Sequence, residues 1–180
     1  MKMNQLFSLN DDLKKEWPVW RKCWIVFILG ALTSLLLITG CANQAPTESE
    51  QAKQALTDFF NYLNQGDYAK ADQLYAGDYQ TLIDWNPEVD PNDHHLLWKN
   101  ACTMNGLQCL KLRSATLREV KGNEYVFTVE FSNLDGSLFV RGPCCGASET
   151  EMPSVSQFDY TIQKDAEGKF KTVDLPVYVP

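Results

Sequence analysis

The sequence predicts an α+β fold, in which helices come first and an antiparallel sheet follows. Two periodicities carry this prediction. Between residues 50 and 101, apolar residues recur at three- and four-residue spacing, whereas from residue 110 onward they alternate with polar residues. The first spacing is that of a helix with one buried stripe, and the second is that of a strand with one buried face. Helices followed by a run of strands indicate helices packed on one face of a sheet.

The first helix has a clear start signal. Thr47 and Glu50 form a capping-box pattern, which predicts a helix over residues 50–64. Its expected buried stripe comprises Ala52, Leu56, Phe59, Phe60 and Leu63. The turn Asn64–Asp67 ends this helix, and Asp67 can cap a second short helix. The two helices are therefore expected to follow each other after a tight turn.

A third helix is predicted from the sequence DPND. Asp90 is expected as the N-cap and Pro91 in the first turn, with the helix running to about Cys102. This helix would bury Leu97 and Ala101. Helix capping therefore explains why acidic residues cluster in this region.

The segment Asp84–His95 also admits a metal-binding interpretation, which its details disfavour. Read as a calcium loop that begins at Asp84, it carries Val89 where the turn needs glycine and His95 where a bidentate glutamate belongs. His94 and His95 are adjacent, so on a helix they point about 100° apart and do not readily share one metal. Capping and turn formation are the favoured roles, and no metal ligand is assigned.

The second half predicts an antiparallel meander of four to five strands. Its clearest strand is Glu124–Phe131, in which Tyr125, Phe127, Val129 and Phe131 share one face. Short turns at residues 121–123 and 165–168 join neighbouring strands. The expected strands are residues 109–120, 124–131, 137–141, 157–163 and 169–175.

The N-terminal region contains an uncharged apolar stretch of 18 residues, 23–40, directly after Arg21 and Lys22. This length is at the lower limit for a transmembrane helix and slightly long for the apolar core of a signal peptide. The positive flank places residues 1–22 in the cytoplasm in either case, so the body lies outside. An uncleaved single-pass protein and a cleaved signal peptide both remain open at this point.

The end of this stretch, LITGC at Leu37–Cys41, resembles the lipobox of bacterial lipoproteins. The resemblance implies that the Cys41 thiol carries a diacylglyceryl group and that the chain is cut before Cys41. Two or three acyl chains make a stable anchor, whereas one does not. The expected organisation is a signal peptide over 1–40, a flexible tether over 41–50 and one domain over 51–180, anchored on the extracytoplasmic face in the periplasm or at the cell surface.

The helix–turn–helix segment ALTDFFNYLNQGDYAKADQLYAGDY, Ala55–Tyr79, resembles the nuclear transport factor 2-like superfamily. The resemblance implies a cone in which a curved sheet wraps a long first helix. The superfamily includes isomerases, dehydratases and binding or assembly domains without chemistry. The resemblance is therefore informative about the fold and leaves the activity open.

The charge balance limits the partners. Residues 41–180 carry 11 basic and 20 acidic side chains, a net charge of −9. Nucleic-acid binding depends on Lys and Arg that neutralise phosphates, so a nucleic-acid partner is not expected. Membrane association is expected only through the N-terminal lipid, and the remaining partners are an apolar small ligand or a protein of the cell envelope.

Four cysteines, Cys102, Cys109, Cys144 and Cys145, belong to the external body. An oxidising compartment favours disulfides. The favoured arrangements are two bridges that link 102/109 with 144/145, or one 102–109 bridge with a free 144/145 pair. Metal binding or redox work by these thiols is the functional alternative.

No catalytic motif stands out. The chain has no Ser-His-Asp signature and no glycine-rich phosphate loop, and no cofactor is expected. A pocket is conceivable from Asp84, Trp85, His94, Trp98 and Tyr160, although aromatic residues more often fill the core. The favoured function is ligand binding or protein interaction in the envelope. The alternative is an isomerase or hydro-lyase with an acid–base site in the cone.

Overall fold

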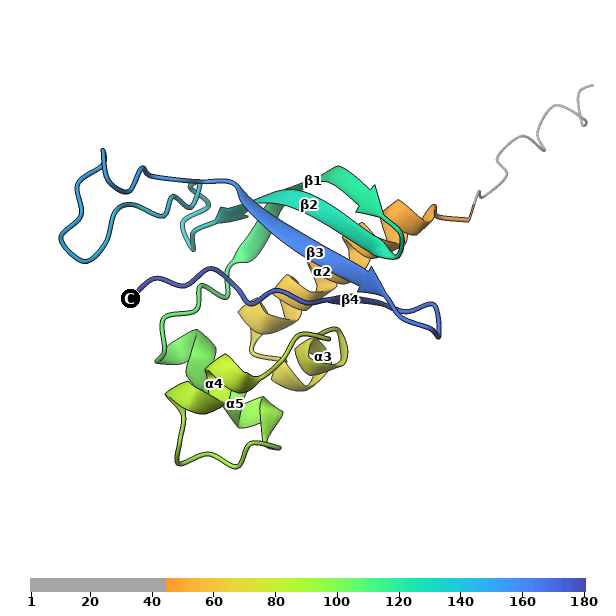
Figure 1. Ribbon diagram of the computed structural model, residues 1–180, viewed down its shortest axis with the longest axis horizontal. Coiled ribbons are helices and arrows are strands. Elements are labelled where there is room, and N and C mark those ends of the chain that lie inside the picture. Colours follow the sequence, from red (N-terminus) through yellow and green to blue (C-terminus); the bar gives the residue numbers. More distant parts are fainter. Residues whose placement is uncertain (1–44) are drawn as a thin grey trace, which may run out of the picture. The chain divides into compact units, whose positions relative to one another are not determined.

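Four helices precede four strands in residues 45–180, the part of the chain that this computed structural model describes (Figure 1). The predicted signal peptide, residues 1–40, and Cys41 with the first residues of the tether lie outside the described residues. The elements are α2 Glu48–Gln65, α3 Tyr68–Gln73, α4 Gln80–Trp85, α5 His94–Thr103, β1 Lys111–Lys121, β2 Glu124–Ser132, β3 Phe158–Lys164 and β4 Phe170–Thr172. The prediction of an α+β fold is confirmed.

The long helix α2 begins two residues earlier than predicted, and its capping box is present. The Thr47 hydroxyl accepts a bond from the Glu50 amide, and the Glu50 carboxylate accepts one from the Thr47 amide at 2.7 Å. All five residues of the predicted stripe are buried. The sequence therefore determines both the start of α2 and the face that it turns inward.

Two details of the short helices differ from the prediction. Helix α4 was not predicted, because its N-cap residue, Tyr79, makes no side-chain capping bond. Helix α5 begins one turn later than predicted, because Asp93 is its cap and accepts a bond from the Leu96 amide at 3.0 Å. Asp90 instead accepts a bond from the Asn92 amide in the preceding turn. A sequence with two aspartates three residues apart offers two caps, and the second one is used.

The sheet is an antiparallel meander in the order β1-β2-β3-β4. Its central strand β2 alternates as predicted, with all four inward aromatic and valine side chains buried. Residues 137–141 do not form a strand. They make only isolated pairs, Ser132 with Leu138 and Arg141 with Val155, so the segment between β2 and β3 is a long loop. Figure 1 shows this loop extending away from the sheet.

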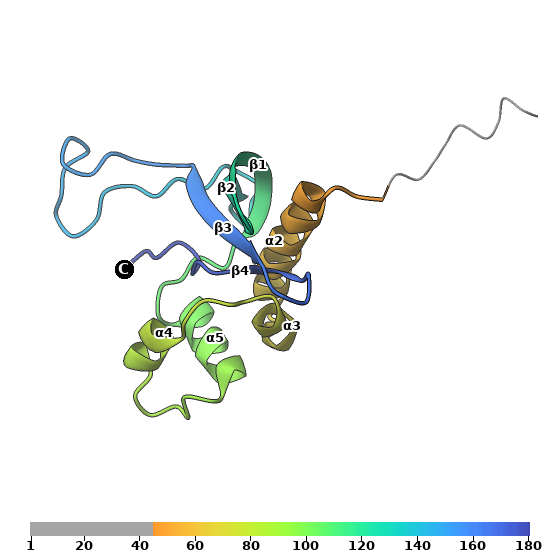
Figure 2. The same cartoon turned by 45° about the vertical axis from the view of Figure 1, so that its right-hand side comes forward.

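Helix α2 lies along one face of the sheet (Figure 2), and the core between them is rich in aromatic rings. The Phe60 ring packs against Phe131 and Tyr160 with centroids 4.7 and 5.0 Å apart, and Phe59 packs against Trp98 at 5.6 Å. Truncating a buried Phe to Ala typically costs about 3–5 kcal/mol. These rings therefore fix α2 on the sheet, and α3, α4 and α5 follow its C-terminal end.

Candidate functional site

The five residues considered for a pocket do not come together in one site. Trp98 and Tyr160 are core residues, with 0% and 2% of their surface exposed. Asp84 is exposed on α4, and its carboxylate accepts a bond from the side-chain Nε2 of Gln80 at 2.7 Å. His94, the first residue of α5, is half-buried, and so is Trp85 at the end of α4.

His94 belongs to a polar cluster that sequence reasoning missed. Its Nδ1 lies 3.0 Å from a carboxylate oxygen of Asp72, and its ring stacks on Tyr79 with centroids 3.8 Å apart. The Tyr79 hydroxyl donates to the same Asp72 oxygen and accepts from the Trp98 indole N–H at 3.2 Å. Asp72 is 22 residues from His94 in the chain, so no local pattern links them. The cluster ties α3 to α5.

Three tyrosines, Tyr79 of this cluster, Tyr75 beside it and Tyr160 elsewhere in the core, are held in the protonated state. Burial raises the pKa of Tyr79 above its ordinary value, and the bonded Asp72 carboxylate adds to the effect. Burial likewise raises the pKa of Tyr75 and Tyr160, with further contributions from nearby aspartates. These phenols can donate hydrogen bonds at neutral pH, but they cannot serve as bases.

Trp85 lines a recess of about 290 Å³, which we call the C-terminal recess. Its rim is open, with 69% of Met104 and 46% of Tyr178 exposed. The Trp85 and Tyr178 rings lie 5.2 Å apart. The lining residues are Trp85, Met104, Asn105, Gly106, Tyr178, Val179 and Pro180.

Main-chain bonds between two distant segments build the floor of the C-terminal recess. The Gln108 amide donates to the Val177 carbonyl at 2.7 Å, and the Val179 amide donates to the Gly106 carbonyl at 3.0 Å. Gly106 has a φ of +84°, and a Cβ at this position would lie 2.4 Å from the Val179 carbonyl oxygen. Only glycine satisfies both conditions, so Gly106 allows the C-terminal segment to approach the loop after α5.

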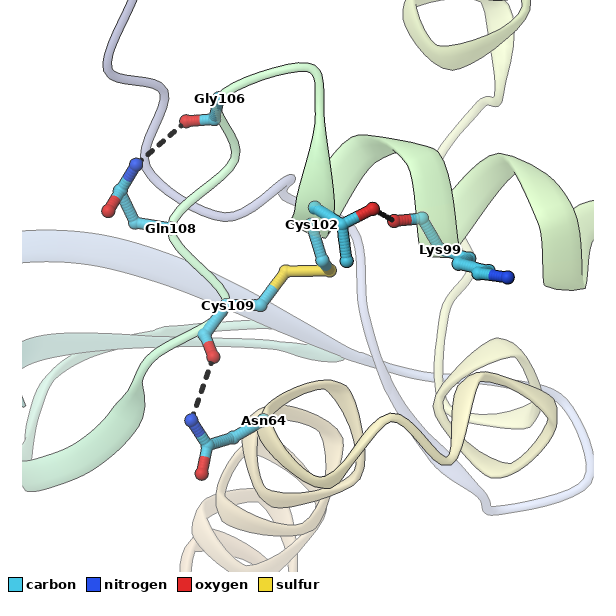
Figure 3. The surroundings of a disulfide bond; sticks show 7 residues. Asn64, Lys99, Cys102, Gly106, Gln108 and Cys109 are labelled. Carbon is cyan, nitrogen blue, oxygen red and sulfur yellow. Dashed lines mark hydrogen bonds between the residues drawn. A yellow bond between two sulfur atoms is a disulfide. The ribbon is translucent and has the colours of Figure 1, made fainter. Parts of the chain in front are cut away.

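A disulfide closes the same loop. The structure joins Cys102 on α5 to Cys109 just before β1, with Cα atoms 5.5 Å apart (Figure 3). The Asn64 side chain donates to the Cys109 carbonyl at 3.1 Å, which fixes this end of the loop against α2. Of the two arrangements expected from the sequence, the structure contains the single 102–109 bridge with Cys144 and Cys145 unbonded, and bridges between the pairs are absent from residues 45–180.

The lining of the C-terminal recess is mixed, with aromatic and methionine side chains beside polar groups. Drug-sized ligands need roughly 300–1,000 Å³ of enclosed space, and this open recess is smaller. Aromatic residues and methionine are enriched in the buried centres of protein interfaces. The Asn105 side-chain oxygen in its wall is buried and has no hydrogen-bond partner among the described residues. The recess therefore has the chemistry of a contact point for another protein.

Sequence reasoning missed most of the C-terminal recess. Its walls come from the end of α4, the loop after α5 and the last three residues of the chain, which share no periodicity. The one available signal was Gly106, which lies between two cysteines close enough in sequence to bond.

Tyr160 contributes one edge to a second recess of about 470 Å³, whose charged lining residues are Arg141, Asp159 and Asp174.

Within residues 45–180, no helix is both long and apolar enough to cross a bilayer. The same residues contain no group of three or more His, Cys, Asp or Glu side chains placed to hold a metal ion. Comparison with protein-family models, curated proteins and solved structures finds no match for this chain.

Proposed function

We propose that this chain is a bacterial lipoprotein, anchored through Cys41 on the extracytoplasmic face, whose nuclear transport factor 2-like domain binds another protein of the cell envelope. The lipobox-like sequence Leu37–Cys41 supports the anchor. The order of elements, with a long first helix on an antiparallel sheet, supports the domain type.

The observation that carries the binding function is that the polar and aromatic residues considered for a pocket lie apart, at the surface and in the core. Asp84 and His94, the carboxylate and the imidazole considered for the pocket, belong to a surface pair and to the Asp72 cluster respectively, and neither lines a recess described above. Trp98 and Tyr160 are used to fill the core. This arrangement favours binding at the surface over acid–base chemistry in the interior.

The C-terminal recess is the proposed contact point, with an apolar side chain of the partner packed against the Trp85 and Tyr178 rings, which already lie against each other. A disulfide and main-chain bonds hold the recess in shape before any partner arrives. Preorganisation of this kind reduces the entropy lost on binding. Trp and Tyr anchors in such recesses supply a large share of interface energy.

Metabolic labelling with a palmitate analogue tests the anchor. The wild-type protein and a Cys23→Ala control should both incorporate the label, because Cys23 lies in the predicted signal peptide. Cys41→Ala should lose it and keep the uncleaved length. Label retained in the Cys41→Ala protein would contradict the lipoprotein assignment, and an unlabelled wild-type protein of uncleaved size would favour a single membrane span.

Site-specific photocrosslinking in intact cells tests the contact point. A photoreactive phenylalanine at Tyr178 should give a discrete crosslinked species, which the additional substitution Trp85→Ala should reduce at least tenfold. The matched control is Leu134, which is 96% exposed and lies outside the C-terminal recess. The same species formed equally from Leu134, or formed undiminished in the Trp85→Ala protein, would remove the recess from the proposal.

A further inference from the structure

A second cysteine pair lies in the loop between β2 and β3, where Cys144 and Cys145 are adjacent in the chain. Their sulfur atoms are 2.7 Å apart, yet the structure leaves them unbonded. Cys145 is exposed and Cys144 is half-buried. A contact this short between two sulfurs, one of them open to solvent, calls for an explanation.

A tight turn brings the two sulfurs together. Adjacent side chains in an extended strand point to opposite faces, so neighbouring cysteines there cannot meet. Here the Ala147 amide donates to the Cys144 carbonyl at 2.9 Å, and φ is +60° at Cys145 and +89° at Gly146. Positive φ at both central residues is the signature of a type I′ turn. In residues 45–180 Cys145 is the only residue other than glycine with positive φ.

Other contacts hold the turn in place. The Cys144 amide donates to the Met152 sulfur at 3.4 Å, and the Ser148 amide donates to the Glu151 carboxylate at 2.8 Å. Cys102 and Cys109 are bonded to each other, so among the cysteines of residues 45–180 the only thiol left for Cys144 is that of Cys145, and the reverse. The loop therefore presents a dithiol that is ready to close on itself.

We propose that Cys144 and Cys145 form a reversible disulfide with each other, which makes this turn a thiol–disulfide switch. The oxidant is an external disulfide, of a small thiol such as glutathione or of another protein. The exposed Cys145 thiolate attacks one sulfur of that disulfide, and the other sulfur leaves and takes up a proton. Cys144 then loses its proton and attacks the Cys145 sulfur, which releases the second external thiol. Two protein thiols are oxidised to one disulfide, and one external disulfide is reduced to two thiols.

The switch differs from the Cys102–Cys109 bond in its accessibility. Exposed disulfides are more easily reduced than structural ones, which resist reduction by glutathione. The bond between Cys144 and Cys145 should therefore open first as the environment becomes more reducing. The turn and the loop around it would change shape, while the Cys102–Cys109 bond beside the C-terminal recess stays closed.

Tryptic peptides separate the two pairs cleanly. Cleavage after Arg141 and Lys164 releases residues 142–164, which contain Cys144 and Cys145 and no other cysteine. Cleavage after Lys99 and Lys111 releases residues 100–111, which contain only Cys102 and Cys109. The full lipidated protein, purified from membranes in detergent, is equilibrated in glutathione buffers, alkylated, digested and analysed by mass spectrometry.

In oxidised glutathione, peptide 142–164 should be unalkylated and lighter than its reduced form by two hydrogen atoms. As the fraction of reduced glutathione rises, this peptide should acquire two alkyl groups before peptide 100–111 does, at a ratio at least tenfold more oxidising. The Cys145→Ser protein should leave Cys144 alkylated or joined to glutathione, with peptide 100–111 unchanged. Three results would overturn the switch: a dialkylated peptide 142–164 in oxidised glutathione, a disulfide between the two peptides, or opening of both pairs at the same ratio.

Discussion

The two cysteine pairs of the domain have opposite surroundings. Cys102 and Cys109 are bonded at the junction of α5 and β1, and main-chain bonds tie the loop between them to the C-terminal segment. Cys144 and Cys145 are unbonded in a long loop, and one of them is exposed. The first pair braces a recess with a fixed shape, whereas the second pair is available for chemistry.

The two pairs also differ in how tightly the backbone beside them is packed. Each pair lies next to a glycine with positive φ, Gly106 with +84° and Gly146 with +89°. A Cβ on Gly106 would collide with the Val179 carbonyl, whereas a Cβ on Gly146 would meet nothing within 4 Å. The two glycines thus provide a matched test of how tightly each region is packed.

The largest expected effect comes from Gly106→Ala. The left-handed conformation costs a residue with a Cβ about 1–2 kcal/mol, and the collision with the Val179 carbonyl adds to it, for a total of about 3 kcal/mol. Gly146→Ala has the backbone cost alone, about 1 kcal/mol. Chemical denaturation of both variants measures the free energy of unfolding. Equal losses in the two proteins would mean that the C-terminal segment does not pack against Gly106.

Removal of the Cys102–Cys109 disulfide should cause the next largest loss of unfolding free energy. Closure of the short 102–109 loop by a disulfide contributes about 2.5 kcal/mol by the chain-entropy relation. The double variant Cys102→Ser, Cys109→Ser should lose about this amount of unfolding free energy. The matched double variant Cys144→Ser, Cys145→Ser should lose less than about 1 kcal/mol, because its loop packs on little else. A reversed order of the two losses would refute the assignment of the structural bond.

The smallest effect is a response of the loop to acid. Hydrogen bonds from Ser154 lower the pKa of Glu149, and those from Ser148 lower the pKa of Glu151, from the usual value of 4.5. Carboxylates with lowered pKa stabilise the folded loop above pH 4.5, and this contribution disappears as the pH falls through their folded values.

Amide resonances of Ser148 and Ser154 should therefore shift with midpoints below pH 4.5, while that of Gln108 stays constant. Glu151→Gln should abolish the shift at Ser148 and leave that at Ser154. A shift at Gln108 with the same midpoint would show that the β2–β3 loop and the C-terminal recess are coupled, which would contradict their independence.

The sequence determined the local elements well. The Thr47–Glu50 capping box, the α2 stripe and the alternation in β2 each depend on residues close together in the chain, and the structure confirms them. The missed α4 and the late start of α5 also have local causes, an N-cap residue without a capping bond in one and two competing aspartates in the other. Signals of this kind predict elements, with errors of about one turn at the ends.

The sites could not be predicted in the same way, because they join distant segments. Asp72 meets His94, and Trp85 meets Tyr178, only after the helices have packed and the C-terminal segment has paired with the loop after α5. Trp98, which was considered for a pocket, lies in the core instead, because large rings stabilise the fold most when they are buried.

Hydrogen–deuterium exchange most directly tests the contrast between the preformed C-terminal recess and the open loop that holds Cys144 and Cys145. In the oxidised wild-type protein, the amides of Gln108 and Val179 should exchange at least a hundredfold more slowly than those of Cys145 and Gly146, because main-chain bonds protect the first two and not the second two. Mild reduction that opens only the 144–145 pair should change exchange in residues 142–157 and leave Gln108 and Val179 protected. Fast exchange at Gln108 and Val179 in the oxidised protein would contradict the preformed recess on which the proposed function depends.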